Sequence, residues 1–504
     1  MKETNMQTLG LNGQLLIDGH WVEGNGIAMA SSNPVDDNPL WHGQGADSNQ
    51  VAQAVDAARA AFKSWRALTP ENRYHYVNQF VEALKQEKAT LAELITLESG
   101  KALWDATTEV GAMIGKGDIS WRAYQERTGV VDKTIAQGTL RIQHKPHGVL
   151  GVFGPYNFPG HLPNGHIIPA LIAGNCVVYK PSELTPAVAE WVVRLWQSVG
   201  LPKGVLNLIQ GGKETGASLA QQPQLDGLLF TGSAKTGRLL HQQLAGQPQK
   251  ILALEMGGNN ALLIDQVADI EGALFTSLFS AFVSSGQRCT CARRILIPDT
   301  QWGDDFLQRL LAASQQLRVD RGNATPQPFM GAVIDANAVK HLQQGVQQLE
   351  QAGATVLLPS QHHNANGTLM SPCVVDMSGF PKTQLTDVDH ELFGPVLQVY
   401  RYTDINQGIE LCNQTRFGLA AGVVSDDVHV QQQFYEEIRA GIVNCNKPLT
   451  GASSEAPFGG VGISGNGRPS AYYAADYCAY PVASIEDANV ALPENRPPGM
   501  DVWK

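Results

Sequence analysis

Residues 149–159 read VLGVFGPYNFP, an apolar run of strand length that ends in a Gly-Pro turn and an asparagine. The same unit, a short apolar run followed by a helical stretch, recurs along the chain as far as residue 264. Alternating β and α units of this length predict a parallel, doubly wound sheet that is covered by helices. We expect its strands at 149–153, 175–179, 205–209, 226–230, 250–254 and 260–264, and its helices at about 164–173, 186–199, 214–221 and 234–245.

The pattern continues on both sides of this region. Apolar residues at helical spacing predict upstream helices at 51–65, at 70–84 and, as one or two helices, at about 91–124. A second α/β domain is predicted downstream by helices at about 268–285, 303–317 and 335–352 and by strands at 294–298, 422–424 and 442–444. Residues 139–144 alternate as a half-exposed strand, which needs a partner, and a sheet edge shared between subunits is one solution.

A cysteine in a polar setting is the first candidate for chemistry. Cys289 lies in the run SSGQRCTCARR at 284–294, where three arginines are close in sequence. Nearby cations lower the pKa of a thiol, and the thiolate is the nucleophilic form. Glu255 follows the apolar run 251–254, where a buried strand end would raise the pKa of a general base. Each motif alone is equally compatible with a structural cysteine or a glutamate on a turn.

Other segments accompany these two in a fixed order. They are GPYNFP at 154–159, VVYKPSE at 177–183, FTGSAKTG at 230–237 and ELFGP at 391–395. With them, the chain from about residue 16 to about residue 485 resembles the NAD(P)-dependent aldehyde dehydrogenase superfamily. The resemblance implies two doubly wound, Rossmann-like α/β domains and a small β extension for oligomerisation. The implied bounds are 12–123 and 146–257 for the NAD-binding domain, 258–457 for the catalytic domain, and 124–145 and 473–488 for the extension.

The resemblance also implies roles for single residues. Cys289 would add to the aldehyde, and the Asn157 amide and the Cys289 backbone N–H would hold the oxyanion. Glu255 would then activate the water that hydrolyses the thioester. The implied cofactor-binding residues are Lys180, Glu183, Gly232, Ser233, Ala234, Lys235, Thr236, Gly237, Glu391 and Phe393.

The cofactor segments are weak signals when they are read alone. The 232–237 turn joins a strand to a helix, whose N-terminus can bind phosphate, but it lacks the G-x-G-x-x-G spacing. Lys180 and Glu183 alone are also compatible with a solvated ion pair. The resemblance implies that Glu183 accepts hydrogen bonds from the adenosine ribose and repels a 2′-phosphate, which favours NAD over NADP.

Four segments resemble a narrower branch of the superfamily, which serves bacterial arginine catabolism and acts on a semialdehyde with carboxylates. They are 156–166, 287–294, 446–452 and 466–477. Such a substrate needs cations in a protein of net charge −11. Arg288 and Lys447, with Ser453 and Ser454 as hydrogen-bond donors, are the candidates, although surface or interface positions fit them equally. The alternatives are another ω-semialdehyde, a betaine-type aldehyde, transfer of the acyl group to CoA, and a protein that keeps the fold without activity.

The overall composition limits the classes of binding partner that we expect. The charge of −11 argues against nucleic acid or an anionic membrane, and no apolar run approaches the length of a membrane span. Seven scattered cysteines and the absence of a signal-like segment after Met1 indicate a reducing cytoplasm. The Cys289/Cys291 and His161/His166 pairs lack the further ligands of a zinc site, so we expect no metal. We expect a homodimer or homotetramer.

Overall fold

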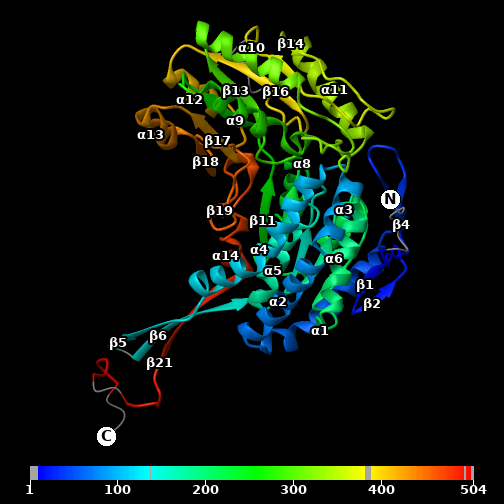
Figure 1. Cartoon of the computed structure of the whole chain (residues 1–504). Helices are drawn as coiled ribbons and strands as arrows, with labels where there is room; N and C mark the ends of the chain where they lie inside the picture. Colours follow the sequence, from blue (N-terminus) through cyan, green and yellow to red (C-terminus); the bar gives the residue numbers. More distant parts are fainter. Residues whose placement is uncertain (1–8, 137, 381–387, 493–494, 501–504) are drawn as a thin grey trace.

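The computed structural model describes residues 9–136, 138–380, 388–492 and 495–500. Two α/β lobes lie one above the other in Figure 1, and a long β arm projects from the lower lobe. Residue 137 of the predicted extension, residues 381–387 of the predicted catalytic domain and the segment after Met1 lie outside the described residues.

The lower lobe is built on a seven-stranded sheet in the order β11-β10-β7-β8-β9-β1-β2. The chain runs outward from β7 through β8 and β9 and then returns to the other side of β7 for β10 and β11, so the sheet is doubly wound as predicted. The parallel strands are β7 (Val149–Phe153), β8 (Cys176–Lys180), β9 (Leu206–Leu208), β10 (Gly227–Gly232) and β11 (Ile251–Met256). An antiparallel edge, which the sequence did not predict, is formed by β1 (Leu15–Ile17) and β2 (His20–Val22).

The first two helices of the lower lobe begin at capping residues of the sequence. Asp47 forms a capping box with Gln50, and Thr69 caps the helix that starts at Pro70. The stretch 91–124 forms two helices, because Gly100, at φ 75°, ends the first of them. The helices are α1 (Ser48–Ala67), α2 (Pro70–Gln86), α3 (Lys88–Ser99), α4 (Leu103–Arg127), α5 (His161–Ala173), α6 (Pro186–Ser198), α7 (Lys213–Gln221) and α8 (Ala234–Gln243).

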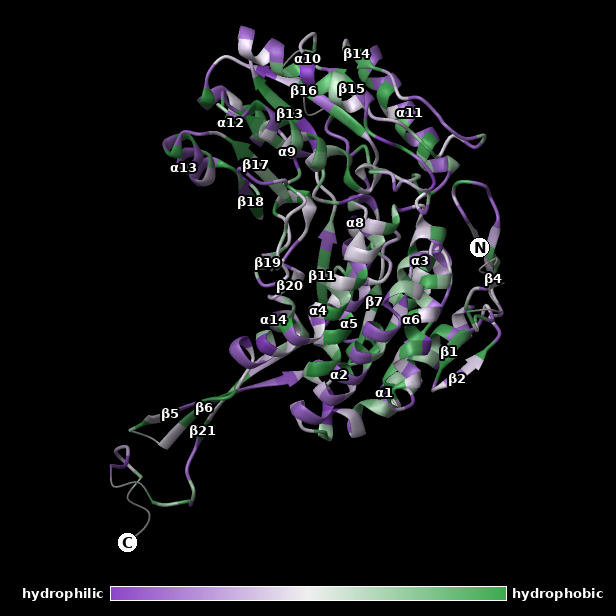
Figure 2. Cartoon of the chain, viewed as in Figure 1, coloured by the Kyte–Doolittle hydropathy of each residue, from purple (hydrophilic) through white to green (hydrophobic). Residues whose placement is uncertain are grey.

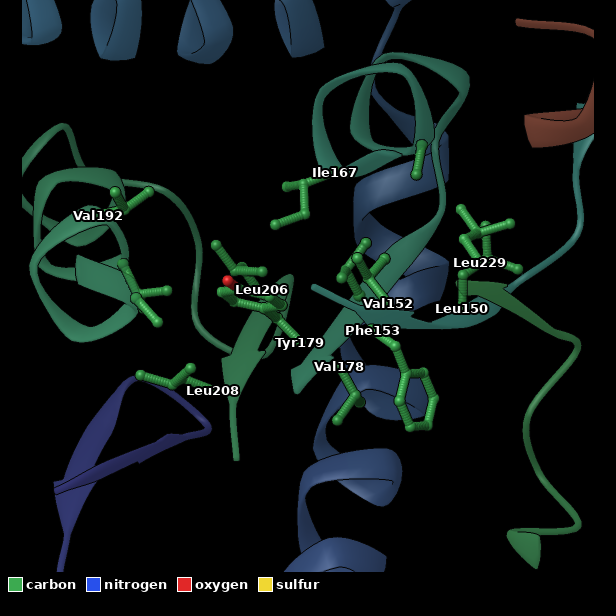
Figure 3. Close-up of a cluster of buried hydrophobic side chains, with 14 of the residues drawn as sticks. Leu150, Val152, Phe153, Ile167, Val178, Tyr179, Val192, Leu206, Leu208 and Leu229 are labelled. Atoms are coloured by element: carbon green, nitrogen blue, oxygen red, sulfur yellow. The ribbon is translucent and has the colours of Figure 1, made fainter. Parts of the chain in front are cut away.

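The core of the lower lobe lies between this sheet and its helices. Phe80 of α2 stacks on Trp196 of α6 with 3.8 Å between ring centroids. Each fully buried Val, Leu or Ile side chain stabilises the fold by about 1.5–3 kcal/mol relative to an exposed one. Figure 3 shows part of this cluster, in which the labelled residues include Leu150, Val152, Ile167, Val178, Val192, Leu206, Leu208 and Leu229.

The upper lobe has a second seven-stranded sheet, in the order β14-β15-β16-β13-β12-β17-β18. β12 follows β11 after only three residues, so residues 257–259 connect the two lobes. The strands are β12 (Asn260–Ile264), β13 (Ala292–Pro298), β14 (Thr355–Leu358), β15 (Cys373–Asp376), β16 (Val396–Tyr402), β17 (Ala420–Val424) and β18 (Ile442–Cys445). Figure 2 shows hydrophilic residues on outer helices such as α13 and hydrophobic residues on inner strands.

Five helices surround this second sheet. They are α9 (Ile270–Phe282), α10 (Gln301–Gln315), α11 (Ala336–Gln351), α12 (Ile405–Asn413) and α13 (Val428–Glu437). The predicted helix at 268–285 ends at Phe282 and continues as the 3-10 turn η1 (Val283–Gly286). The sequence predicted the second domain but missed β14–β16, α12 and α13.

The arm is a three-stranded antiparallel sheet in the order β21-β6-β5. β6 (Gly138–Pro146), which contains the predicted strand 139–144, lies between β5 (Val131–Ile135) and β21 (Ala479–Glu486). Both partners therefore come from the same chain, and no second subunit is needed to pair this strand. Val131 and Ile485 on the arm are 58% and 63% exposed, so apolar side chains of the arm face solvent.

Small elements complete the fold. β3 (Ala28–Ser32) pairs with β4 (Pro39–Gln44), and β19 (Pro457–Phe458) pairs with β20 (Ser470–Ala471). The 3-10 turn η3 (Gly462–Ser464) and α14 (Ala474–Cys478) lead back toward the arm. Among the described helices, none combines the length and the apolar character that crossing a membrane requires.

Candidate active site

Four of the sequence motifs meet at one edge of the lower sheet. β7, β8, β10 and β11 are parallel, so their carboxyl ends lie on the same side. These ends carry or lead into Asn157, Lys180, Ser233 and Glu255 respectively. The strand order reverses between β7 and β10, and doubly wound sheets bind ligands outside the carboxyl ends of the strands at such a point. The topology therefore places a site at this edge.

Glu255 is buried in β11 and hydrogen-bonds to the thiol of Cys289. Burial, followed by the charge of Glu391, raises the pKa of Glu255 to about 8, although the bond with Cys289 opposes the shift. The Oε1 atom of Glu255 has no hydrogen-bond partner among the described residues. A buried carboxyl group with a raised pKa and an unpaired oxygen beside a thiol is suited to act as a general base.

Cys289 lies on a tightly held loop between η1 and β13. Ser284 and Ser285 adopt the left-handed region, with φ 55° and 54°. The Ser284 hydroxyl donates to Oδ2 of Asp105 on α4 at 2.5 Å, which ties the loop to the lower lobe. The Asn260 amide donates to the Cys289 carbonyl at 2.7 Å, which ties it to β12. Hydrogen bonds from both lobes therefore hold the loop that carries the cysteine.

The expectation that three arginines lower the pKa of the Cys289 thiol is wrong. Arg288 pairs with Asp105, with 2.6 Å between Nη2 and Oδ1. Arg293 and Arg294 are buried, and their guanidinium groups donate to backbone carbonyls. The arginines hold the loop in place, because buried carbonyl groups need hydrogen-bond donors.

The pKa of the Cys289 thiol is raised well above its ordinary value. Burial is the largest cause, and the carboxyl groups of Glu255 and Glu391 add to it. The resting thiol is therefore protonated and needs a base to become a nucleophile. Glu255 is the group in contact with it.

Asn157 lies beside the same loop. Its Nδ2 donates to the carbonyl of Gln287 at 2.9 Å, two residues before Cys289. A side-chain amide has two N–H groups, so Asn157 can keep this bond and donate to a second acceptor. The position suits an oxyanion donor next to the thiol.

The turn at 232–237 forms the predicted helix N-terminus. The Ser233 hydroxyl caps α8 by accepting from the Thr236 N–H at 3.2 Å. A cavity of about 440 Å³ beside this turn is lined by Ser233, Ala234 and Lys235 and also by Glu391. The cavity therefore joins two predicted cofactor segments that are far apart in sequence, and a helix N-terminus suits a phosphate group.

Two glycines in this turn allow close packing. A Cβ atom at Gly237 would lie 2.2 Å from the sulfur of Met256, and one at Gly232 would lie 2.6 Å from the ring of Phe230. A larger residue at either position would require the Met256 or Phe230 side chain, or the backbone of the turn, to move. The glycines therefore set the position of the helix N-terminus.

The segment with Glu391 and Phe393 lies against the connection between the lobes. The Gly258 N–H donates to Glu391 Oε1 at 3.1 Å, and Arg293 Nη2 lies 3.9 Å from the same oxygen. The Phe393 ring makes an edge contact with Tyr156, at 6.0 Å between centroids. The structure thus brings this distant segment beside the Cys289 loop and the end of β7.

Lys180 and Glu183 lie at the end of β8. Lys180 is buried and donates to the carbonyl of Pro181 at 2.6 Å, and its Nζ is 3.7 Å from Glu183 Oε2. The Glu183 side chain is 55% exposed, so its carboxylate faces solvent at the same sheet edge. This position suits contact with the hydroxyl groups of a ribose.

The four candidate substrate-binding residues have different environments in the structure. Arg288 is engaged by Asp105, and Lys447 and Ser453 are exposed. Ser454 is half-buried, and its hydroxyl accepts from Lys116 of α4 at 3.3 Å. The Ser454 hydroxyl therefore contacts the buried cation of Lys116.

Sequence reasoning missed a buried ion pair beside Asn157. Lys101 Nζ lies 2.6 Å from Glu109 Oε2 and 3.6 Å from the centroid of the Phe158 ring. Glu109 Oε1 accepts from the N–H groups of Gly160 and His161 at 2.9 and 3.1 Å. The pair thus clamps the segment that follows Asn157. The sequence contains a signal for buried charges on this helix. Asp105, Glu109 and Lys116 occupy positions of α4 that face the core, where apolar residues are expected.

No group of three or more His, Cys, Asp or Glu side chains among the described residues is arranged to hold a metal ion. His166 uses both ring nitrogens in contacts with Tyr477 and Thr231. Cys291 is buried, and its thiol donates to the carbonyl of Val283 at 3.7 Å.

Comparison with known proteins agrees with this geometry. Residues 21–481 match the model of the aldehyde dehydrogenase family. The match spans most of the chain, and the chain belongs to the aldehyde dehydrogenase family.

Curated proteins similar to this chain include several named N-succinylglutamate 5-semialdehyde dehydrogenase. The protein from Chromobacterium violaceum is 54% identical over 486 residues, which are 96% of this chain and 99% of that protein. The protein from Serratia proteamaculans is 52% identical over 487 residues, which are 96% and 98% of the two chains.

Solved structures show the same fold. Betaine aldehyde dehydrogenase from Staphylococcus aureus, in complex with NAD+, is 27% identical with a TM-score of 0.90, over 97% of this chain and 98% of that one. An NADP dependent enzyme from E. coli is 29% identical with a TM-score of 0.88, over 96% and 99%. Both nucleotides therefore occur among structural relatives.

Proposed function

We propose that this protein oxidises N-succinyl-L-glutamate 5-semialdehyde to N-succinyl-L-glutamate in arginine catabolism, with NAD as the hydride acceptor. Curated relatives of that name are 52% and 54% identical over nearly the whole chain. The observation that carries the chemistry is the contact between buried Glu255 and the Cys289 thiol at the sheet edge.

The proposed reaction uses three groups of this chain. Glu255 takes the proton of the Cys289 thiol, and the sulfur adds to the aldehyde carbon. Asn157 and the Cys289 backbone N–H donate to the oxyanion of the thiohemiacetal. Loss of hydride, for which NAD supplies the acceptor when bound, leaves a thioester on Cys289. Glu255 releases the thiol proton to solvent and then takes a proton from a water whose oxygen attacks the thioester carbon. The C–S bond breaks, the acid leaves, and the Cys289 thiolate takes the proton back from Glu255.

We assign cofactor binding to residues at the carboxyl edge of the lower sheet. The N-terminus of α8, capped by Ser233, faces the cavity in which the pyrophosphate would lie. Lys180 and Glu183 would hold the adenosine ribose, and Glu391 and Phe393 would hold the nicotinamide end. The Glu183 carboxylate favours NAD, because a 2′-phosphate would meet a like charge.

The lobes and the arm support the proposed division of the chain. Residues 12–123 and 146–257 would bind NAD, residues 258–457 would carry the nucleophile, and 124–145 with 473–488 would join subunits. The exposed apolar residues of the arm, such as Val131 and Ile485, support a homodimer or homotetramer. The seven free cysteines support a cytoplasmic location.

Transfer of the acyl group to CoA is the competing outcome. The unpaired Oε1 of Glu255 favours attack by water, because it offers an acceptor for a water proton next to the thioester carbon. The test is the product formed from the semialdehyde and NAD with and without CoA, identified by mass spectrometry. We expect NADH and free N-succinylglutamate in both reactions. Accumulation of an acyl-CoA, or a requirement for CoA, would replace the hydrolytic function with the transferase function.

A further inference from the structure

Lys116 of α4 is a buried cation without a buried counter-ion. Lys116 is only 1% exposed to solvent. The neighbouring buried charges on α4 are paired, Asp105 with Arg288 and Glu109 with Lys101. Among the described residues, Lys116 makes no ion pair, and its hydrogen bond is to the Ser454 hydroxyl at 3.3 Å. Burial without a partner is costly for a charge, so the position calls for an explanation.

The groups around Lys116 add to its positive character. His161 and His166 on α5 are titratable groups that interact electrostatically with Lys116. Lys101 and Arg288 also interact electrostatically with His161. The Nδ1 atom of His161 is buried without a hydrogen-bond partner among the described residues. Burial alone lowers the pKa of Lys116 to about 8, since no carboxylate of the chain opposes the shift. Lys101 and Arg288 have carboxylate partners, whereas Lys116 has none among the described residues.

A series of contacts connects this cluster with Cys289. Arg288, which precedes the cysteine, lies 5.1 Å from the centroid of the Phe158 ring. That ring lies 6.4 Å from the ring of His161, which in turn feels the charge of Lys116. Phe158 and His161 therefore link the surroundings of Lys116 to the loop that carries Cys289. Ser454, which contacts Lys116, is half-buried, so the cluster borders the surface there.

The proposed substrate has the matching shape. Its aldehyde is at one end, an α-carboxylate lies near the middle, and the succinyl carboxylate is at the other end. The extended molecule is roughly 10 Å long, since close to three residue lengths of chain, at about 3.3–3.6 Å each, separate its ends. With its aldehyde carbon held at Cys289, the molecule would extend away from the thiol. Lys116, which has no ion-pair partner in the described part of the chain, is the cation of the neighbouring cluster that would meet its far carboxylate.

We infer that Lys116, together with the Ser454 hydroxyl, binds the succinyl carboxylate of the substrate and selects for it. The inference rests on the proposed function and extends it to the residues that recognise the far end of the molecule. The substrate supplies the anion that Lys116 lacks among the described residues, and a charge-assisted hydrogen bond forms in a desolvated site.

The test compares three aldehydes with purified variants. N-succinylglutamate semialdehyde has the far carboxylate, N-acetylglutamate semialdehyde lacks it but keeps the α-carboxylate, and hexanal has neither. We expect Lys116→Met to lower kcat/KM for the succinyl substrate by about 100-fold, mainly through KM, because a buried carboxylate would lose its partner. The values of kcat/KM for the acetyl substrate and for hexanal should change by less than about threefold.

Controls separate recognition from folding. Lys116→Met replaces an unpaired buried charge with an apolar chain of similar size, so the unfolding temperature should not fall. Lys85→Met is the matched control, because Lys85 is an exposed lysine of α2 that pairs with Glu82. Ser454→Ala removes the hydroxyl group that contacts Lys116 and should lower kcat/KM for the succinyl substrate about tenfold. It serves as the test if the Lys116 variant does not fold.

Two results would be decisive against the inference. An unchanged ratio between succinyl and acetyl substrates in the Lys116 and Ser454 variants would remove both residues from recognition. An equal loss for all three aldehydes would show a general effect on the site. In either case wild-type activity on the succinyl substrate would leave the proposed function in place. A wild-type enzyme that oxidises hexanal but neither amino-acid semialdehyde would instead refute the proposed function.

Discussion

Arg288 Nη2 lies 2.6 Å from Asp105 Oδ1, and this ion pair joins α4 of the lower lobe to the residue that precedes Cys289. Asp105 also accepts from the Ser284 hydroxyl, so a single carboxylate holds two points of the cysteine loop. Both partners are largely buried. Removal of one member of such a pair leaves an uncompensated charge, which costs about 3–5 kcal/mol.

Asp105→Ala should therefore lower the free energy of unfolding by about 3–5 kcal/mol and lower kcat as the loop loses its anchor. Asp118→Ala is the matched control, because Asp118 is an exposed residue of the same helix that pairs with Arg122. That surface pair should contribute at most about 1 kcal/mol. Denaturant unfolding and steady-state kinetics measure both effects. Equal stability of the two variants would show that the Asp105 pair does not hold the loop.

Cys289→Ala should abolish dehydrogenase turnover and leave folding and NAD binding intact. The reason is that the thiol forms the covalent bond to the aldehyde. Cys291→Ala is the control, since its thiol is buried and directed to the Val283 carbonyl. Rates of NADH formation and NAD titrations measure the outcome. Activity above about a few per cent in the first variant, or loss of turnover in the second, would move the nucleophile away from Cys289.

The pH profile should report the ionisation of Glu255. Burial and Glu391 raise its pKa to about 8, so the carboxylate that accepts a proton forms as the pH rises through this value. We expect kcat/KM to increase about tenfold per pH unit below about 8 and to level off above it. Glu255→Gln should remove this dependence and lower kcat by about 100-fold or more.

Glu391 provides a second check on that assignment. Its charge is the second cause of the raised pKa of Glu255, so Glu391→Gln should move the midpoint of the profile to lower pH. A profile that is flat between pH 6 and pH 9 in the wild-type enzyme, or unchanged by Glu255→Gln, would contradict the role of Glu255 as the base.

Nucleotide choice should depend on Glu183. Its exposed carboxylate lies 3.7 Å from Lys180 at the end of β8, where it would meet the 2′-position of the ribose. We expect NAD to be preferred over NADP by about ten- to a hundredfold, and Glu183→Gln to reduce this preference mainly by improving the KM for NADP. Glu271→Gln, at an exposed position that pairs with Arg309, is the control. A preference that survives Glu183→Gln would place the selectivity elsewhere.

The parallel sheets could be predicted from the sequence, whereas the arm could be predicted only in part. The bounds of the strands at 149–153 and 260–264 were predicted residue for residue, because fully buried strands are continuous apolar runs. The assignment of 260–264 to the first sheet was wrong, since this strand belongs to the sheet of the upper lobe. β21 and β5 expose most of their residues, so no apolar run identifies them. β6 was predicted, and it pairs with β5 in a local hairpin, but its pairing with β21 depends on contacts between residues more than 300 positions apart.

The candidate site was predicted where motifs follow strands and missed where charges are buried. Asn157, Ser233 and Glu255 could be placed because the carboxyl ends of parallel strands lie on one edge. The arginines around Cys289 were misread, since sequence proximity does not reveal that buried carbonyls take their hydrogen bonds. Lys116 on α4 was overlooked, because a charged residue within a helix usually lies on its solvent face.

The most direct test of the central claim is kcat/KM with NAD for N-succinylglutamate semialdehyde, succinate semialdehyde and hexanal under the same conditions. The account predicts the highest value for N-succinylglutamate semialdehyde, by at least about tenfold over the uncharged aldehyde, because cations near the site would otherwise lack a partner. Equal values for the three aldehydes would contradict it, since the enzyme would then not recognise the carboxylates of its substrate.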